Sequence, residues 1–492
     1  MTSETLSTDL AAAPQDQSLA ARNRLVINIL LVSAFVVMLN ETIMGVAIPR
    51  LMVSLDVAAS AAQWLTTAFL LTTAVVIPVT GFLLQRYNTR PIFIAALTLF
   101  SLGTLLAAAS PNLAVLIVAR VVQASGTAIM MPLLMTTVMT LVPPEARGKT
   151  MGNISIVMSV APAIGPTISG FILNYLDWRF LFILVLPIAL GALALGWRRM
   201  VNVTTPHSAP LDVVSVIISA LAFGGIVYGL SSLGAPAEPG AIPAFVPLAI
   251  GVVAMVAFIW RQLQLQRRDS ALLDLRTFGS KNFTFSVLMM AVMMMAMFGT
   301  IIVLPIYMQD VLGLDTLKTG LLLLPGGLLM GLLGPFVGRL YDKVGPTRLL
   351  VPGIILVSAV LWAMTLLGPD TWWLYILAGH LIMSIGFAFL FTPLFTASLS
   401  SVAPQFYSHG SAILGSIQQV MGAAGVALFV ALMSAQTTAL VASEHSPLEA
   451  LAGGVRLAFL CGAIISLVAV VLAFFVRRPA NQGAPGGGAA MH

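Results

Sequence analysis

The sequence predicts an all-α polytopic membrane protein with fourteen transmembrane helices. Of its 492 residues, 59% are hydrophobic and only 8% are charged, and the mean hydropathy of +1.02 lies far above that of water-soluble domains. The apolar residues form runs of roughly 20, about the length at which a helix crosses a ~30 Å hydrocarbon core. Because ten-residue segments of alternating hydropathy are absent, a membrane barrel is not expected.

The apolar runs define the expected spans, which are 25–48, 62–84, 91–109, 113–141, 150–174, 180–199, 212–233, 241–263, 283–308, 319–340, 349–368, 372–398, 410–435 and 453–476. An even number of spans places both termini on one side. Most Lys and Arg residues lie on that side, and only Arg50, Arg179, Lys318 and Arg456 lie on the other. The positive-inside rule therefore predicts cytoplasmic termini in a plasma or inner membrane.

These spans divide the chain into six parts: a cytoplasmic tail (1–24), a six-helix bundle (25–199), two additional spans (200–263), a basic cytoplasmic linker (264–282), a second six-helix bundle (283–476) and a disordered cytoplasmic tail (477–492). We expect the linker to be a solvated connector, with contact to anionic lipid as the alternative. No apolar core of a cleavable signal peptide precedes the first span. Cys461 is the only cysteine, which excludes an intramolecular disulfide and a multi-cysteine metal site.

A weak internal repeat relates the two bundles. The segment "GFLLQRYNTR" (81–90) follows the second span and "GRLYDKVGPTR" (338–348) follows the tenth. Each begins with Gly and carries a polar or acidic residue four positions later, Gln85 or Asp342, followed by a base. The same hairpin thus recurs eight spans apart, as expected for two six-span halves separated by two extra spans.

Glu41 is the one acid, and Arg120 the one base, that the sequence places deep inside a span. Both lie about seven residues from the non-cytoplasmic ends of their spans, or roughly 10–12 Å deep at 1.5 Å per residue. Ionisable groups at such depth are costly and need partners, so a Glu41–Arg120 pair is the simplest arrangement. Since burial and a nearby guanidinium act in opposite directions on a carboxyl pKa, the pair suits proton coupling. A structural ion pair is the alternative.

Three further features are candidates for binding or gating. The fifth span, "GNISIVMSVAPAIGPTISG" (152–170), combines small residues with a proline, which is typical of close helix packing and also suits a hinge. The ninth span opens with six methionines, of which Met293 and Met297 share a helical face that suits variable apolar ligands, although methionine packing is more common. His380 is the only histidine expected inside a span, and a packed or pore-facing role is favoured over that of a ligand.

Together these segments resemble the major facilitator superfamily, and within it the fourteen-span drug:proton antiporters that include lincomycin-resistance pumps. The two hairpins resemble its "GxLxDRxGRR" loop, "RVVQASG" (120–126) its "RxxQGxG" motif, and 152–170 its antiporter motif "Gx8Gx3GPx2GG". "LNETIMGVAIP" (39–49) resembles the acidic first-span motif of this branch and "LPIYMQDVLG" (304–313) its ninth-span ending. The resemblance covers nearly the whole chain.

The resemblance implies two bundles that rock around a central cavity, exporting amphipathic or lipophilic drugs in exchange for protons. The residues it assigns to proton coupling are Glu41 and Arg120. The candidate residues for substrate binding are Asn40, Glu41, Gln123, Met293, Met297, Gln309 and His380. The residues it assigns to gating are Gly81, Arg86, Arg90, Gly152, Gly165, Pro166, Gly170, Gly338, Asp342, Lys343 and Arg348. Gln85 departs from the loop motif, in which an Asp is usual, so a latch in the first half must be weaker or use the glutamine amide.

We expect no cofactor and no metal, the proton gradient being the energy source. The expected partners are the lipid bilayer, protons and small amphipathic molecules such as lipophilic monocations or lincosamide-like antibiotics, with no nucleic acid and a functional monomer. An exporter of an endogenous metabolite, lipid or peptide and an inward proton symporter remain alternatives, because fold does not fix substrate. An enzyme or a receptor is disfavoured because no catalytic constellation or soluble domain is present.

Overall fold

The computed structural model describes residues 14–204, 206, 211–233 and 242–478, and within these ranges every regular element is a helix. In this described part of the chain, fourteen helices are long and apolar enough to cross a membrane, which confirms the predicted fold class and number of spans.

The long helices are α1 (Pro14–Leu55), α2 (Ala59–Arg86), α3 (Thr89–Ala108), α4 (Leu113–Leu141), α5 (Arg147–Tyr175), α6 (Phe180–Arg199), α7 (Val213–Leu233), α8 (Phe245–Leu265), α9 (Lys281–Ile306), α10 (Thr316–Val344), α11 (Thr347–Met364), α12 (Trp373–Ser400), α13 (Tyr407–Ala442) and α14 (Pro447–Ala473). The short turns are η1 (Pro144–Ala146), η2 (Gln266–Arg268), η3 (Leu275–Gly279), the π-helical η4 (Tyr307–Val311) and η5 (Pro404–Phe406).

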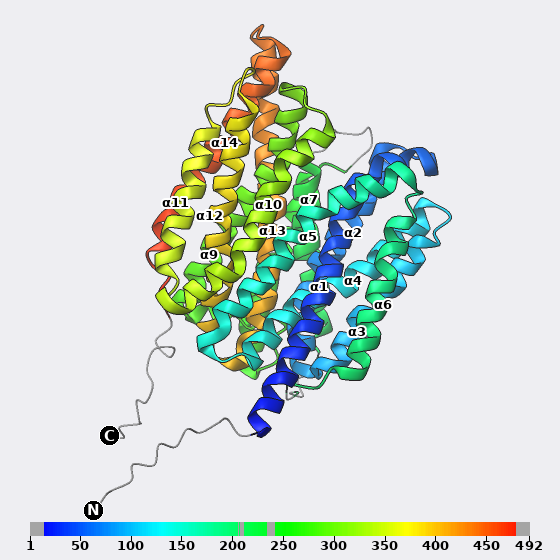
Figure 1. Ribbon diagram of the computed structural model, residues 1–492, viewed down its shortest axis with the longest axis vertical. Coiled ribbons are helices and arrows are strands. Elements are labelled where there is room, and N and C mark those ends of the chain that lie inside the picture. Colours follow the sequence, from blue (N-terminus) through cyan, green and yellow to red (C-terminus); the bar gives the residue numbers. More distant parts are fainter. Residues whose placement is uncertain (1–13, 205, 207–210, 234–241, 479–492) are drawn as a thin grey trace, which may run out of the picture.

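The helices form two bundles, α1–α6 and α9–α14, that lie side by side (Figure 1). Two pairs of helices carry most of the packing between the bundles: α5 with α10, and α2 with α13. Because α10 and α13 occupy in the second bundle the places of α2 and α5 in the first, these two seams are related by the internal repeat. The additional helices α7 and α8 pack on each other, and α7 also packs on α2 and α13, one from each bundle.

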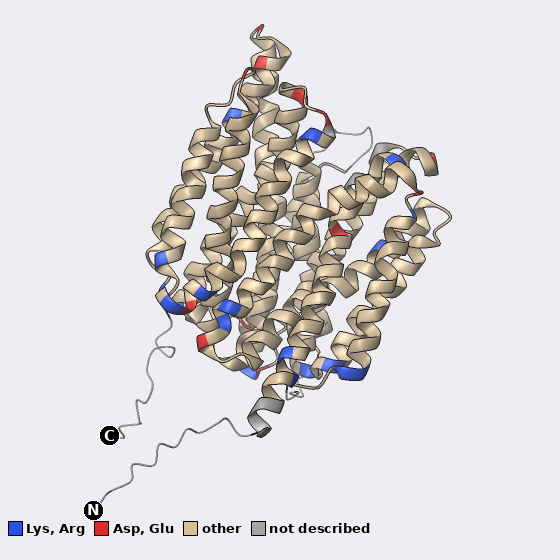
Figure 2. Ribbon diagram, in the orientation of Figure 1, with Lys and Arg blue, Asp and Glu red and all other residues tan. Residues whose placement is uncertain are grey.

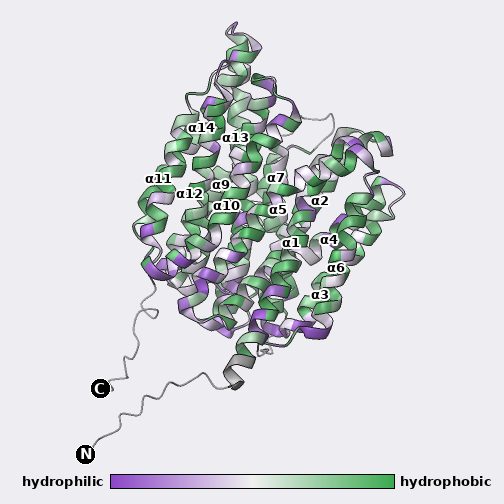
Figure 3. Cartoon of the chain, viewed as in Figure 1, coloured by the Kyte–Doolittle hydropathy of each residue, from purple (hydrophilic) through white to green (hydrophobic). Residues whose placement is uncertain are grey.

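Both described chain ends lie at one end of the molecule, which we call the basic end, and the opposite end is the far end (Figure 1). Figure 2 shows Lys and Arg gathered at the basic end. Figure 3 shows hydrophobic residues along the helices between the two ends, with hydrophilic residues concentrated at the ends. This is the distribution expected of a multi-pass membrane protein.

Helix α1 begins at Pro14, so residues 14–24 of the expected N-terminal tail are helical. One expectation about the connections is wrong. The linker is not a simple solvated connector, since residues 271–274 are all buried, with at most 6% of their surface exposed. Most of the predicted C-terminal disordered tail, 479–492, lies outside the described residues.

The α5–α10 seam is closest at glycines. A Cβ atom built on Gly152 would lie 2.8 Å from the Gly334 carbonyl carbon and 2.9 Å from Pro335 Cα, both backbone atoms of α10. Backbone cannot move aside as a flexible side chain can, so only glycine permits this approach. By contrast, nothing lies within 4 Å of a Cβ built on Gly170, further along α5.

Replacement of Gly152 by Leu should therefore destabilise the folded protein, by roughly 1–3 kcal/mol for overpacking. The thermal midpoint of the purified protein in detergent measures this. Gly170→Leu is the matched control on the same helix and should leave the midpoint nearly unchanged. Equal losses in both variants would contradict the role of the close seam.

Candidate functional site

Arg120 is the most deeply buried charge of the first bundle and lies where four helices meet. Its residue surface is 1% exposed. A guanidinium carries five N–H donors and keeps its charge, so its burial requires acceptors from the surrounding helices.

The acceptors around Arg120 are neutral. Arg120 Nη1 donates to Gln123 Oε1 at 2.6 Å and to Asn40 Oδ1 at 3.3 Å, and Nε donates to the Leu65 carbonyl at 3.4 Å. The guanidinium carbon lies 4.1 Å from the centroid of the Phe69 ring, a cation–π distance. Gln123 is itself fixed, because its Nε2 donates to Thr104 Oγ1 at 2.8 Å. The Arg120 side chain is thus held jointly by helices α1, α2, α3 and α4.

Glu41 lies next to Asn40 on α1 and is half-buried. Its charge and that of Arg120 are near enough to interact electrostatically. Among the described residues, however, its carboxylate makes no hydrogen bond and no ion pair within 4.0 Å. The predicted direct Glu41–Arg120 pair is therefore not formed in this conformation. Arg120 Nε and Nη1 instead bond to neutral groups, which leaves the carboxylate available to another partner.

Residues of the fifth-span motif fix α1 against α5 close to Glu41. Gly165 faces Thr42, and a Cβ on Gly165 would lie 3.0 Å from the Thr42 Cβ. Ser169 Oγ donates to the Ile43 carbonyl at 3.1 Å. Pro166 lies between them within the continuous helix α5. These contacts hold the part of α1 that carries Glu41.

At the basic end, Asp342 joins the two bundles by capping a helix of the other half. Its Oδ1 accepts from the Gly148 backbone N–H at 2.8 Å and its Oδ2 from the Lys149 N–H at 2.9 Å. Both N–H groups belong to the first turn of α5, where the helix dipole favours an anion. The carboxylate thus supplies charge-assisted bonds across the α5–α10 seam.

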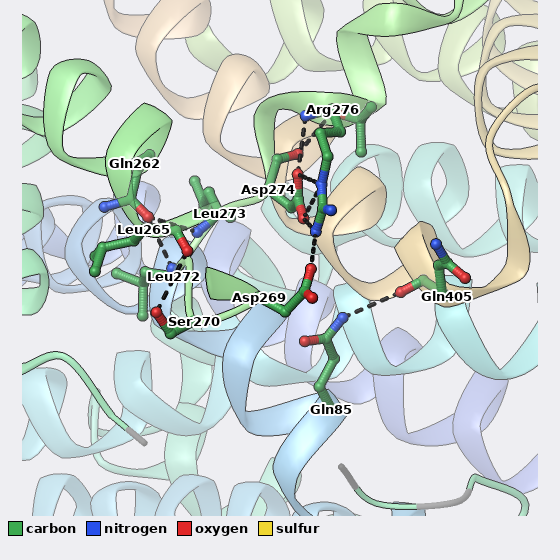
Figure 4. Close-up of polar contacts among 11 residues, drawn as sticks. Gln85, Gln262, Leu265, Asp269, Ser270, Leu272, Leu273, Asp274, Arg276 and Gln405 are labelled. Carbon is green, nitrogen blue, oxygen red and sulfur yellow. Dashed lines mark hydrogen bonds and ion pairs between the residues drawn. The ribbon is translucent and has the colours of Figure 1, made fainter. Parts of the chain in front are cut away.

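Gln85 occupies the equivalent place at the α2–α13 seam. Its Nε2 donates to the Gln405 carbonyl at 3.1 Å (Figure 4). This is the amide contact that the departure from the loop motif suggested. It carries no net charge, so this seam has no counterpart of the Asp342 cap among the described residues.

The remaining hydrogen bonds between the bundles also lie toward the basic end. Ser155 and Thr392 hydroxyls lie 2.6 Å apart, Thr136 and Ser411 hydroxyls lie 2.8 Å apart, and Arg147 Nη2 donates to the Tyr407 hydroxyl at 3.2 Å. Within the described ranges, no hydrogen bond joins the bundles near the far end. The bundles are therefore fastened to each other at the basic end.

The other basic-end motif residues lie in the helices on either side of the two short turns, in α2, α3, α10 and α11. Gly81 packs against α13, and Gly338 faces Gly148 of α5. Arg90 Nη2 donates to the Trp197 carbonyl at 2.7 Å, which ties α3 to α6, and Arg86 lies 6.0 Å from the Tyr87 ring centroid. Lys343 and Arg348 are exposed.

The candidate binding residues of the second bundle are dispersed, and none bonds to Glu41 or Arg120 among the described contacts. Met293 is 1% exposed and belongs to the core, whereas Met297 is half-buried. Gln309 lies in the π-helical turn η4. His380 Nε2 lies 3.1 Å from the Leu323 carbonyl, and its buried Nδ1 has no partner in the described part of the chain.

Sequence reasoning missed several residues that shape the site. Phe69 and Thr104 are ordinary span residues by type, and only their distance from Arg120 and Gln123 reveals their role. The hydroxyl pairs between the bundles are likewise invisible without the fold. No group of three or more His, Cys, Asp or Glu side chains suited to a metal lies together in the described ranges.

Comparisons with known proteins agree with this architecture. A sequence profile of the Major Facilitator Superfamily matches residues 30–426. The uncharacterized MFS-type transporter YcnB of Bacillus subtilis is 37% identical over 454 residues, covering 92% of this chain and 95% of that protein. Lincomycin resistance protein LmrB of Listeria monocytogenes is 37% identical over 453 residues, covering 91% of this chain and 95% of that protein. The solved structure of the human organic anion transporter MFSD10 is 14% identical, with a TM-score of 0.63 over 92% of this chain and 99% of that one.

Replacement of Gln123 by Leu should destabilise the protein, because it removes the acceptor that lies nearest to Arg120 and the amide group that donates to Thr104. The expected loss is about 1–3 kcal/mol for buried polar groups left unpaired. Thermal unfolding in detergent measures it, with Ser125→Ala as the control, since the half-buried Ser125 bonds only within α4, to the Val121 carbonyl. A Gln123→Leu variant as stable as the control would show that Arg120 does not depend on this contact.

Proposed function

The chain belongs to the Major Facilitator Superfamily, and we propose that it is an antiporter that exports amphipathic or lipophilic drugs in exchange for protons. It is a multi-pass membrane transporter and not an enzyme. The observation that carries the proposal is the unpaired carboxylate of Glu41 beside a guanidinium that neutral groups already satisfy.

The drug class rests on two grounds. A protein 37% identical over 91% of this chain is named for lincomycin resistance. In addition, the site has one deep carboxylate among largely apolar helices, which suits a lipophilic monocation or a bulky amphipathic molecule better than a dication. We propose that such substrates are taken from the cytoplasmic side, with the chain acting as a monomer.

The orientation follows from charge. The Lys and Arg residues gather at the basic end, which supports, by the positive-inside rule, the proposal that this end faces the cytoplasm, in a plasma or inner membrane. In the described conformation the bundles are fastened at this end, by Asp342 among other groups. This conformation then corresponds to the state closed to the cytoplasm, and breaking these contacts gives the alternate state.

The exchange is a competition for one carboxylate. From the far end, Glu41 takes up a proton, which neutralises it while Arg120 remains held by Gln123 and Asn40. After the basic end opens, a substrate enters and Glu41 releases the proton to the cytoplasm. A proton is therefore carried inward and a substrate outward. Coupling requires that the states open to the two sides differ in their affinity for the proton and for the substrate.

Replacement of Glu41 by Gln keeps the shape of the side chain and removes its titration, so it should abolish gradient-driven transport while substrate still binds. Lincomycin or a lipophilic dye is offered to inverted vesicles with an acidic interior, and its accumulation should fall at least about tenfold, the effect of losing an essential proton site. Asp370→Asn, which removes an exposed acid near the far end, is the control.

Two results would contradict this proposal. A Glu41→Gln variant that pumps normally against a gradient would remove proton coupling from Glu41. Accumulation by the wild type only when the gradient is reversed would identify a symporter, since the sign of the driving gradient separates the two modes.

Replacement of Asp342 by Asn should slow export, because one of the two acceptor oxygens at the start of α5 becomes a donor group and the charge is lost. Losing one charge-assisted bond corresponds to a roughly three- to tenfold change in the balance of states. Initial rates in the same vesicles measure it. Asp315→Asn is a matched control on the same helix, since Asp315 caps the far end of α10 and Asn caps helices equally well. Equal rates for Asp342→Asn and wild type would exclude the latch.

A further inference from the structure

The base of the α7–α8 hairpin is a closed polar network. Arg261 donates to both oxygens of Asp212, at 2.6 and 2.7 Å, and these bonds hold the pKa of Asp212 down at about 2. Ser215 donates to Asp212 Oδ2 through its backbone N–H at 3.1 Å and through its hydroxyl. The start of α7 and the end of α8 are therefore fixed to each other, and the Asp212–Arg261 pair stays ionised over the physiological pH range.

Gln262 carries this network into the linker. It is fully buried, and its Nε2 donates to Ser215 Oγ at 2.9 Å. Its Oε1 accepts from two successive linker N–H groups, those of Leu272 and Leu273, at 2.7 and 3.2 Å (Figure 4). One side-chain amide thus satisfies two buried backbone donors ten and eleven residues away, which fixes the path of the linker.

The linker path places Leu273 in the α2–α13 seam. A Cβ built on Gly81 of α2 would lie 3.4 Å from Leu273 Cδ2 and 3.1 Å from the Cβ of Ala412 on α13. Leu273 is 3% exposed and Ala412 is fully buried. An apolar side chain of the linker is therefore enclosed between a helix of the first bundle and the beginning of a helix of the second.

The next residues fasten the linker to α13. Asp274, 3% exposed, accepts from Arg276 Nε and Nη2 at 2.9 and 2.6 Å, and Asp269 also accepts from Arg276 (Figure 4). The Arg276 guanidinium lies 5.3 Å from the centroid of the Phe406 ring, in the turn before α13. His409, in the first turn of α13 beside this part of the linker, is also buried, at 3% exposure.

We propose that α7, α8 and residues 269–280 form one brace, the linker brace, that holds the α2–α13 seam closed at the basic end. The proposal rests on the alternating access put forward above, in which this end opens. It also gives the two additional spans a role, since α7 packs on both helices of this seam. Gln262 and Leu273 act as positioning residues and not as substrate ligands.

The reason is geometric. Opening of the basic end requires α2 and α13 to separate, so Leu273 must lose its contact with one of these two helices. Because Gln262 fixes the backbone of Leu273 to the hairpin, the linker cannot follow both helices. The closed seam is therefore favoured, because it buries Leu273 and keeps the hydrogen bonds between Gln262 and the linker backbone at the same time. An open state keeps only one of the two.

The test is a distance measurement across the seam by pulsed electron paramagnetic resonance. Spin labels are placed at Tyr87→Cys, after α2, and Ala403→Cys, before α13, both exposed, with Cys461→Ser removing the only native thiol. In lipid nanodiscs, Gln262→Leu removes three buried hydrogen bonds and Leu273→Ala removes apolar burial. Each variant, independently, should raise the share of long distances at least about threefold.

Gln266→Leu is the matched control. Gln266 lies one turn further along, and its side-chain oxygen has no hydrogen-bond partner in the described chain, so its replacement should leave the distances unchanged. Asp342→Asn serves as the positive control for opening. Melting temperatures are recorded for every variant.

The outcomes separate this proposal from the proposed function. If Asp342→Asn lengthens the distances and both brace variants leave them unchanged, the brace is overturned and alternating access stands. This holds whether or not the brace variants lower the melting temperature. Longer distances in the brace variants together with normal pumping by Glu41→Gln would support the brace and reject proton coupling at Glu41. No change in any variant, Asp342→Asn included, would reject both the brace and opening at this end.

Discussion

The burial of the Arg120 guanidinium is the constraint on which the first bundle depends. An ion of this kind inside a membrane bundle is stable only where the surrounding helices supply acceptors with good geometry. Here they come from α1, α2 and α4, with α3 holding Gln123 in place. The close packing of these four helices and the position of Glu41 are therefore parts of one arrangement. Because the acceptors are neutral, the arrangement stabilises the charge without using the carboxylate next to it.

The same logic governs the contacts between the bundles. The proposed alternation needs contacts strong enough to define a closed state and weak enough to break. The hydrogen bonds between the bundles are one carboxylate cap, one amide contact, two hydroxyl pairs and the Arg147–Tyr407 bond, all toward the basic end, while close glycine packing extends along α5 and α10. Hydroxyl pairs and helix caps can be exchanged for water when the end opens, which keeps the difference between the two states small.

Features with a strong local signal could be predicted from the sequence, and those made by long-range packing could not. Fourteen apolar runs, with Glu41 and Arg120 inside two of them, follow from composition and spacing alone, and the Gln85 departure pointed to an amide contact that the structure contains. The direct Glu41–Arg120 pair was the simplest expectation because neither Phe69 nor the Leu65 carbonyl carries any sequence signal. The linker was misjudged for a related reason. Its Arg residues suggested solvent, yet Arg276 is neutralised by Asp274 and Asp269, and Leu272 and Leu273 are buried.

The two seams are related by the internal repeat but are stabilised by different kinds of interaction. At α5–α10 the motif acid is present, and a charge on the first turn of a helix closes the seam. At α2–α13 the acid is replaced by Gln85, whose single neutral bond is weaker. The linker brace lies at that second seam, where Leu273 meets Gly81 and Ala412. Apolar burial and an amide-fixed backbone there take the place of the missing charge. The helix cap depends on the electrostatics of one contact, whereas the brace depends on the packing of α7 and α8. The additional spans therefore give the protein a second, independent means of controlling the opening of its basic end.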